Sequence, residues 1–294
     1  MTSGSGPLTA VEIEGLPLFR SGKVRDTFDL GDRLLMVATD RLSAFDCVLP
    51  DPIPGKGRVL TQMSRFFFSK SSGLVPNHLL PDDPSVIPPA LREQLAGRVM
   101  FCRKAERIDV ECVVRARLAG SGWEEYREQG TLAGEPLPAG LGFGDRLPET
   151  RFTPAAKNDH GHDQNISRSE LANRVGPDLA ESLERASLRL FEFATELCRR
   201  AGIWLVDTKF EFGLIEGRLT LIDEALTPDS SRMWLTGQPV SSANSLGFDK
   251  QLVRDHLVAV GWDRTPPAPR LPAELIAEVQ RRYQEVQRRI TTSS

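Results

Sequence analysis

Short runs in which hydrophobic and polar residues alternate dominate the first forty positions and predict a small antiparallel sheet. Gly22 and the Gly31-Asp32 pair separate these runs and are the residue types that tight turns require. Two further apolar runs flank a polar link at residues 105–109. The elements predicted in this part of the chain are strands at 16–20, 24–30, 33–39, 99–104 and 110–118 and helices at 60–68 and 90–96.

Helical spacing of apolar residues appears in the second half of the chain. Residues 177–201 have one apolar face, an acidic first turn at Asp178 and a stop at Gly202, so they predict a helix. Residues 131–154 are rich in Gly and Pro and predict a long loop. The other predicted elements are strands at 203–207, 210–215 and 219–223 and helices at 123–129, 249–260 and 271–290.

These elements predict an α+β fold with two lobes, each containing an antiparallel sheet, around a cleft. We expect a flexible tail at residues 1–10, a smaller N-terminal lobe at 11–109 and a larger C-terminal lobe at 110–294.

Composition narrows the class of protein. The chain has 294 residues, of which 40% are hydrophobic and 26% charged, as is typical of globular proteins. Its net charge of −3 argues against a nucleic-acid-binding scaffold, and no apolar run is long enough to cross a bilayer. The first ten residues lack the apolar core of a signal peptide. The four cysteines are far apart without a CxxC pair, so we expect a reduced, cytoplasmic protein without a zinc site.

Four charged clusters indicate chemistry. The first is the glycine turn Ser21–Asp26, where backbone N–H groups and Lys23 can hold a phosphate chain. An ordinary hairpin with a surface lysine is the alternative. The second is Glu111–Gly122, in which Arg115 lies within an apolar strand and needs an anionic partner. That partner is either a substrate anion, held also by Ser121, or an internal carboxylate.

The third cluster is Lys157–Asp163, which contains His160 and His162. Its HxH spacing is compatible with a metal site, and its position after a long loop with a segment that contacts substrate.

The fourth cluster lies on neighbouring predicted strands. Asp207, Lys209 and Glu211 project from one face of a strand because they alternate, and Asp223 and Glu224 end the next strand. Such carboxylates suit Mg²⁺ shared with nucleotide phosphates. A polar sheet face with cross-strand ion pairs is the alternative.

In this order the clusters resemble the SAICAR synthetase family. The resemblance rests on seven colinear segments: GKVRDTFDLGDRLLMVATDRLSAFD, IPGKGRVLTQMSRFFF, ECVVRARLAGSGW, FTPAAKNDHGHDQNIS, DTKFEFG, LIDEALTPDSSRMW and FDKQLVRDHL. It implies two α+β lobes with ATP in the cleft, related to ATP-grasp and kinase-like folds. It also implies a reaction in which ATP phosphorylates the carboxylate of carboxyaminoimidazole ribonucleotide (CAIR) and the amine of L-aspartate displaces phosphate.

The resemblance implies roles for individual residues by motif position. Lys23 would contact ATP phosphates, Arg103 would begin the 103–109 link that passes the adenine, and Glu211 and Asp223 would hold Mg²⁺ and ATP. The residues implied for CAIR are Arg115, Ser121, Asp207, Lys209, Arg232, Lys250 and Arg254. Asp207 and Lys209 would act in catalysis.

The aspartate end is implied less directly, by Lys157, His162, Asp40 and Ser43. Relatives often have Ser-Thr where this chain has Ala155-Ala156, which removes two hydroxyl groups from the substrate loop. The expected partners are ATP, CAIR and L-aspartate only, in a monomer or homodimer. A small-molecule kinase and an inactive nucleotide-binding module are the alternative functions; the inactive module would lack Lys23 or a metal carboxylate, and all are present.

Overall fold

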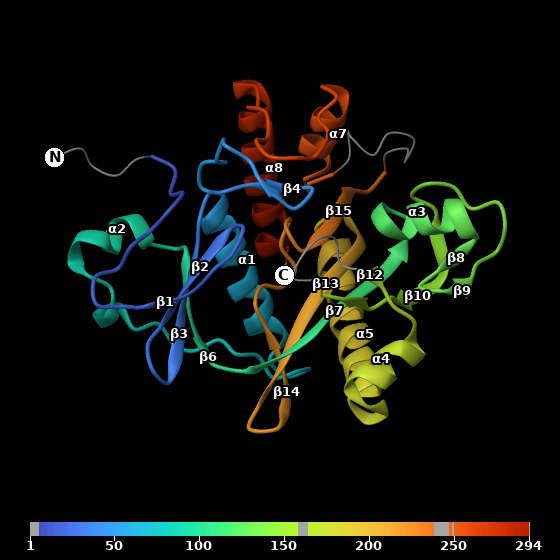
Figure 1. Ribbon diagram of the computed structural model, residues 1–294, viewed down its shortest axis with the longest axis horizontal. Coiled ribbons are helices and arrows are strands. Elements are labelled where there is room, and N and C mark those ends of the chain that lie inside the picture. The colour runs from blue at the N-terminus through green and yellow to red at the C-terminus, as the bar shows by residue number, and fades with distance from the viewer. Residues whose placement is uncertain (1–5, 158–163, 238–246, 249, 294) are drawn as a thin grey trace.

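The computed structural model describes residues 6–157, 164–237, 247–248 and 250–293. Two antiparallel sheets lie side by side, with the N-terminal sheet on the left of Figure 1 and the second sheet on its right. The N-terminal sheet has the order β1-β2-β3-β6. Its strands are β1 (Leu18–Ser21), β2 (Arg25–Asp29), β3 (Arg33–Ala38) and β6 (Val99–Arg103).

The second sheet is built around two long neighbouring strands, β7 (Glu106–Arg117) and β13 (Ile203–Ile215). Its order is β12-β11-β7-β13-β14, with β10 paired to β7 and β15 to β13. The other strands are β10 (Arg146–Phe152), β11 (Ala155–Ala156), β12 (Gln164–Asn165), β14 (Arg218–Ile222) and β15 (Ser231–Leu235). These pairings confirm an α+β fold with antiparallel sheets.

Alternation along β7 and β13 gives the second sheet two different faces. Val110 and Cys112 on β7, with Phe210 and Phe212 on β13, pack in the main core. The long amphipathic helix α5 (Pro177–Arg200) covers this face. The opposite face is therefore left for the charged residues that alternate with them.

The main core joins the two sheets. Helix α1 (Lys56–Ser71) places Phe67 against Phe210 of β13, with ring centroids 6.3 Å apart, and against Phe193 of α5 at 6.0 Å. The same core includes Met36 and Met100 from the N-terminal sheet. A second, smaller core covers the other face of that sheet.

The remaining elements surround these layers. They are β4 (Ser43–Ala44), β5 (Cys47–Val48), η1 (Pro84–Val86), η2 (Pro89–Leu91), α2 (Arg92–Leu95), α3 (Gly120–Gln129), β8 (Thr131–Leu132), β9 (Glu135–Pro136), α4 (Arg168–Val175), α7 (Gln251–Ala259) and α8 (Ala273–Thr292). No helix of the described residues is long and apolar enough to cross a membrane.

Several predicted boundaries were wrong. The polar link at 105–109 is mostly strand, because cross-strand pairing with β13 extends β7 back to Glu106. The strands predicted at 203–207 and 210–215 are one strand, since β7 pairs with residues 207–214 across the predicted break. The predicted loop at 131–154 contains β8, β9 and β10.

The predicted tail also differs, because Leu8 is buried and its backbone N–H donates to Asp40. Residues 1–5 lie outside the described part of the chain.

Candidate active site

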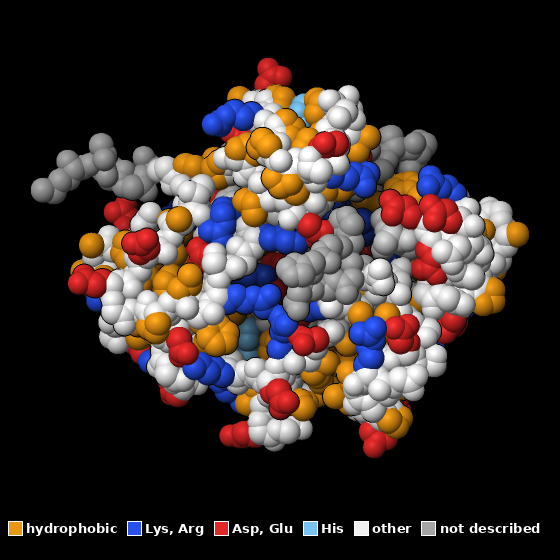
Figure 2. Space-filling view, in the orientation of Figure 1, with side chains coloured by type: hydrophobic (Ala, Val, Ile, Leu, Met, Phe, Trp, Pro, Cys, Tyr) orange, Lys and Arg blue, Asp and Glu red, His pale blue; other side chains and the backbone are white. Residues whose placement is uncertain are grey.

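Charged side chains gather on the face of the second sheet that α5 does not cover. Figure 2 shows Lys and Arg side chains concentrated near the centre of the molecule, with acidic side chains between them. Three groups of ion pairs occupy this region, around Asp207, around Glu211 and Asp223, and around Asp229. Each group is described in turn below.

Two arginines share Asp207. Its Oδ2 accepts from Nη1 of Arg115 at 3.1 Å and from Nη1 of Arg232 at 2.7 Å. Arg115 also donates from Nη2 to Ser121 Oγ at 3.0 Å. Burial lowers the pKa of Arg115, and attraction to Asp207 opposes that shift. Two guanidinium groups facing one carboxylate leave a net positive charge, which favours a bound anion.

The start of α3 lets Arg232 approach closely. Gly120 has φ +52°, and a Cβ built there would lie 2.1 Å from Nη2 of Arg232. Only glycine tolerates both the left-handed backbone and this contact. The Gly120-Ser121-Gly122 segment therefore brings the hydroxyl of Ser121 and the guanidinium of Arg232 together beside Arg115.

Lys209 lies between the basic and acidic parts of the face. Its Nζ is 2.7 Å from Oε1 of Glu111, which lies diagonally across on β7, opposite Glu211. Burial alone would lower the pKa of Lys209, but attraction to Glu111 outweighs it and the pKa is raised. Lys209 is therefore a stable cation and not a general base.

The acidic part contains Glu211 of β13 and Asp223 and Glu224 after β14. Lys157 pairs with Glu211 at 2.5 Å, and Arg25 of β2 pairs with Asp223 at 2.7 Å and with Glu224 at 3.2 Å. Burial and repulsion by Glu211 and Glu224 raise the pKa of Asp223 to about 6, against the attraction of Arg25. Burial also favours the neutral form of Glu211, but Lys157 outweighs it and the pKa is lowered.

These carboxylates fit a divalent cation that is shared with phosphates. Mg²⁺ takes one or two protein carboxylates and completes its shell with water and substrate oxygens. Repulsion among Glu211, Asp223 and Glu224 is the electrostatic situation that a cation relieves. Within the described residues no group of three His, Cys, Asp or Glu side chains is close enough to form an all-protein site.

A third group of ion pairs was not predicted. Asp229 accepts from Lys56 of α1 at 2.7 Å and from Tyr283 of α8 at 2.7 Å, and lies 3.1 Å from Lys250. Burial, Lys56 and nearby Arg254 lower the pKa of Lys250 to about 8, against the attraction of Asp229. Lys250 and Arg254, both predicted to bind the ribose phosphate, are thus close in space.

The sequence analysis did not single out Lys56 and Asp229 of this group, although the sequence around each residue marks it as unusual. Lys56 is 1% exposed at the start of an apolar helix, and Asp229 lies in the TPDSS run. Both segments were among the matched motifs, but neither residue was assigned a role. Their long-range contact appears only when α1 and the second sheet pack together.

The remaining predicted residues lie in different surroundings. Lys23 is half exposed in the glycine turn and pairs with Asp46. Arg103 ends β6 and donates to the backbone oxygen of Asn77 at 3.0 Å. Ser43 is half-buried in the β4–β5 hairpin, next to Asp46. His162, like His160 and Asp163, lies outside the described residues.

Asp40 does not fit its predicted role at the aspartate end. Its side chain is fully buried, and it accepts from Nη1 of Arg98 at 2.9 Å and from the N–H of Gly57 at 2.9 Å. The same carboxylate accepts from the N–H of Leu8. Both oxygens are used inside the fold, so the structure gives Asp40 the role of fixing α1 and the N-terminal segment.

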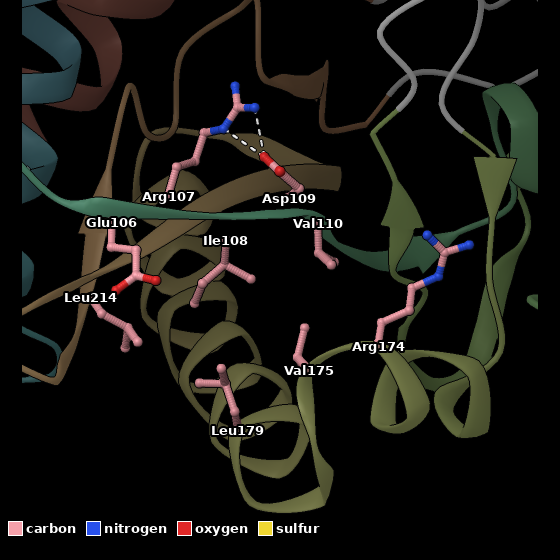
Figure 3. Close-up of a pocket in the computed structure, with 9 residues that line it drawn as sticks. All are labelled: Glu106, Arg107, Ile108, Asp109, Val110, Arg174, Val175, Leu179 and Leu214. Atoms are coloured by element: carbon pink, nitrogen blue, oxygen red, sulfur yellow. Dashed lines mark hydrogen bonds and ion pairs between the residues drawn. The ribbon is translucent and has the colours of Figure 1, made fainter.

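A separate cavity of about 310 Å³ opens beside the first residues of β7. Figure 3 shows Ile108, Val110, Val175 and Leu179 around it, between β7 and the helices α4 and α5. It is therefore on the α5 side of the sheet. The charged face described above is on the other side.

Two antiparallel sheets with a charged face between them, rich in both carboxylates and cations, define an enzyme that binds anionic small molecules. Residues 18–269 match the sequence profile of the family described as SAICAR synthetase. The chain belongs to the SAICAR synthetase family.

Relatives in bacteria cover nearly all of the chain. A phosphoribosylaminoimidazole-succinocarboxamide synthase of Elusimicrobium minutum is 46% identical over 284 residues, 95% of this chain and 97% of the relative. One of Desulfosudis oleivorans is 49% identical over 278 residues, 93% and 95% of the two chains. Among solved structures, SAICAR synthase from Saccharomyces cerevisiae, complexed with SAICAR, has a TM-score of 0.87 and 36% identity, and covers 97% of this chain and 98% of its own.

The chain is accordingly a ligase of purine biosynthesis. It uses ATP to join the carboxylate of CAIR to the amine of L-aspartate, which gives SAICAR, ADP and phosphate.

Proposed function

We propose that the charged face of the second sheet positions CAIR and ATP in line along β13. Asp207, with Arg115 and Arg232, would bind CAIR at one end, and Glu211 and Asp223 would face the ATP phosphates at the other. Asp207 and Glu211 are four residues apart, or roughly 13 Å along a strand. The observation that supports this arrangement best is Lys209, a partly exposed lysine midway between them, whose Nζ is 2.7 Å from Glu111.

The first step needs charge neutralisation more than bond-making by the protein. The carboxylate of CAIR attacks the γ-phosphorus of ATP, and ADP leaves, so two anionic groups must approach each other. The positive charge of Lys209, on β13 of the second sheet, would reduce this repulsion, and so would that of Lys23 in the glycine turn. Fixed cations in a site that excludes water are an efficient way to stabilise such charge.

In the second step, the amine of L-aspartate attacks the acyl carbon and inorganic phosphate leaves. The protein supplies alignment of the two reactants and exclusion of water, which would otherwise hydrolyse the acyl phosphate. Lys157 and Ser43 remain the proposed contacts for L-aspartate among the described residues. Lys157 currently pairs with Glu211, so it lies at the acidic end of the face.

Glu211 and Asp223 would hold Mg²⁺ together with the phosphates of ATP. Mg²⁺ would neutralise phosphate charge and fix the phosphate chain for transfer. Arg25 of the N-terminal sheet lies 2.7 Å from the carboxylate of Asp223, and Lys157 pairs with Glu211, so each of the proposed metal carboxylates is held by a cation.

Component omission with mass spectrometry tests the reaction. Purified protein is incubated with ATP, Mg²⁺, CAIR and L-aspartate, and ADP and the succinocarboxamide product are followed while one component at a time is left out. We expect product only in the complete mixture. ADP formed with CAIR alone would show phosphorylation uncoupled from amide formation, and intact ATP binding without turnover would contradict the proposed function.

Asp223→Asn tests the metal assignment. We expect turnover to fall by about three orders of magnitude, because an amide is a poor Mg²⁺ ligand. Since burial disfavours the charged form of Asp223, the Tm of the ligand-free variant at pH 7 should equal or exceed that of the wild type. Activity and Tm are measured on the same sample, with Glu181→Gln on the exposed face of α5 as the control. Normal turnover of Asp223→Asn would refute the assignment.

We also propose that the protein works in the cytoplasm, as a monomer or a homodimer. Its four cysteines are all free and three are buried, which suits a reducing compartment. Light scattering coupled to gel filtration distinguishes the two oligomeric states directly.

A further inference from the structure

The C-terminal helix α8 reaches the ion pairs around Asp229, although it lies entirely beyond residues 18–269, which match the family profile. One face of α8 is buried in the main core through Val279, Tyr283, Val286 and Ile290. Tyr283 is 1% exposed, and it is the only one of these four side chains with a polar group. A buried phenol needs a hydrogen-bond partner, because its hydroxyl has lost contact with water.

The hydroxyl of Tyr283 donates to Oδ1 of Asp229 at 2.7 Å. The other carboxylate oxygen, Oδ2, accepts from Nζ of Lys56 at 2.7 Å and lies 3.1 Å from Nζ of Lys250. The two oxygens therefore have separate partners, since α8 holds Oδ1 and the two lysines meet Oδ2. The carboxylate cannot turn about its Cβ–Cγ bond without breaking these contacts.

Water screens this group of charges only weakly. The exposed fraction of the side chain is 2% for Asp229, 0% for Lys56 and 11% for Lys250. The two ammonium groups repel each other, and their distances from the shared carboxylate decide how well that repulsion is offset. Arg254, one turn after Lys250, donates its backbone N–H to the Lys250 carbonyl at 3.0 Å. Two lysines facing one carboxylate leave a positive charge, which suits a phosphate group.

Packing of α8 against α1 fixes the position of the tyrosine hydroxyl. Gln287, one turn after Tyr283, donates to the side-chain oxygen of Gln62 on α1. Lys56 begins the same helix, so α8 meets α1 directly at Gln62 and through Asp229 at Lys56. With its ring held in the core, Tyr283 presents its hydroxyl to Asp229 from a fixed direction.

We propose that Tyr283 is a positioning residue for CAIR. Its hydroxyl fixes the carboxylate of Asp229, so that Oδ2 holds Nζ of Lys250 where it meets the ribose phosphate. This inference rests on the proposed role of Lys250 toward that phosphate, and it makes the C-terminal helix a part of the CAIR site. Because Tyr283 acts through other side chains, it affects the binding of CAIR and not the chemical steps.

Tyr283→Phe tests this role, because it removes one oxygen atom and keeps the ring in the core. We expect the KM for CAIR to rise about tenfold, the effect of one lost hydrogen bond to a charged group. The KM values for ATP and L-aspartate, and kcat, should stay within about twofold of the wild type.

The matched control is Val286→Ala on the same buried face of α8, which loosens the packing of the helix and leaves the tyrosine hydroxyl in place. It should lower Tm and leave the KM for CAIR unchanged. Equal increases of this KM in Val286→Ala and Tyr283→Phe would overturn the inference, because they would assign the effect to packing.

A double-mutant cycle with Lys250→Met shows whether Tyr283 acts through Lys250. Methionine keeps an unbranched side chain there and removes the charge. Tyr283→Phe should raise the KM for CAIR in the wild type and should have no further effect in Lys250→Met. Equal increases in both backgrounds would contradict a role that passes through the lysine.

A second measurement does not depend on the folding of Tyr283→Phe. The chain has only two tyrosines, so Tyr126→Phe labelled with ¹³Cζ-tyrosine has a single tyrosine resonance, that of Tyr283. CAIR should shift this resonance, because its phosphate draws Lys250 and weakens the pair with Asp229, whereas ATP with Mg²⁺ should leave it unchanged. No shift at saturating CAIR would overturn the inference.

Lys250→Met alone separates this inference from the proposed function. An unchanged KM for CAIR in Lys250→Met refutes the role of Lys250 at the phosphate, on which the inference rests. A raised KM in that variant, together with an unchanged KM in Tyr283→Phe, refutes only the role of Tyr283.

Discussion

At the scale of single residues, burial decides which charged side chains can act. Ion pairs hold Arg115 of β7 and Asp207 and Lys209 of β13, two neighbouring strands whose opposite face packs in the core. Their positions are therefore fixed before substrate binds. Asp40 is charged and close to a matched motif, yet its oxygens are used by Arg98 and backbone N–H groups. The sequence cannot separate these cases, because both are acidic residues next to apolar ones.

Arg115→Ala should weaken CAIR binding far more than ATP binding. The change removes a buried cation that donates to Ser121, and it takes from Asp207 one of the two arginines that hold its Oδ2. We expect the KM for CAIR to rise about 100-fold or more, the KM for ATP to change less than threefold, and Tm to fall, since a broken buried pair costs roughly 3–5 kcal/mol. Steady-state kinetics measure both constants. Arg185→Ala, paired with Glu181 on the exposed face of α5, is the control. Equal effects on both substrates would contradict the assignment.

Lys250 predicts a pH dependence for CAIR binding. With its pKa lowered to about 8, the free enzyme loses this positive charge as pH rises through 8. Because we propose that the protonated form of Lys250 binds the ribose phosphate, kcat/KM for CAIR should decrease by up to about tenfold between pH 8 and 9.5, while kcat stays nearly level. Lys250→Arg keeps its charge over this range and should remove the decrease. A decrease that persists in Lys250→Arg would assign it to another group.

At the scale of elements, strand pairing turns single motifs into a site. The register of β7 and β13 sets Arg115 opposite Asp207 and Glu111 opposite Glu211. The alternation of residues 207, 209 and 211 was readable from the sequence, and so was their common face. Which strand lies beside them was not, because it depends on pairing between residues almost one hundred positions apart.

Gly120→Ala should disturb the CAIR end through α3. An added methyl group would overlap the guanidinium of Arg232, and the left-handed backbone at φ +52° adds strain. We expect the KM for CAIR to rise at least tenfold with ATP binding unaffected. Gly130→Ala at the other end of α3 is the matched control, because it has φ +69° and nothing within 4 Å of the added Cβ. It should cost about 1 kcal/mol of stability without affecting CAIR. Similar KM values for the two variants would contradict this explanation.

At the scale of the whole molecule, the two sheets share one core. Phe67 of α1 touches both Phe193 of α5 and Phe210 of β13, and the same core reaches the N-terminal sheet. Lys56 of α1 meets Asp229 and, through it, Tyr283 of α8. The predicted boundary between the two lobes, between residues 109 and 110, therefore falls within one continuous hydrophobic core.

We expect the ligand-free protein to unfold in a single cooperative transition. Neither sheet can lose its structure without exposing part of the main core, so both should melt together. Scanning calorimetry checks this through the ratio of the calorimetric to the van't Hoff enthalpy, which should be close to one. Two resolved transitions would show that the sheets are independent units.

The sequence by itself determined the local structure and the chemistry. Periodicity predicted α5 and the strands of both sheets, and the order of seven motifs identified the family, because these features depend on neighbouring residues. It also predicts a metal-binding role for Glu211 and Asp223, and that Arg115 needs an anionic partner. Only the tertiary structure decided that Asp40 is internal, that Lys56 reaches Asp229, and that the backbone of His78 bridges Leu221 of β14 and Arg103 of β6. These contacts join residues that are distant in sequence, and they exist only after α1 and the two sheets have packed against one another.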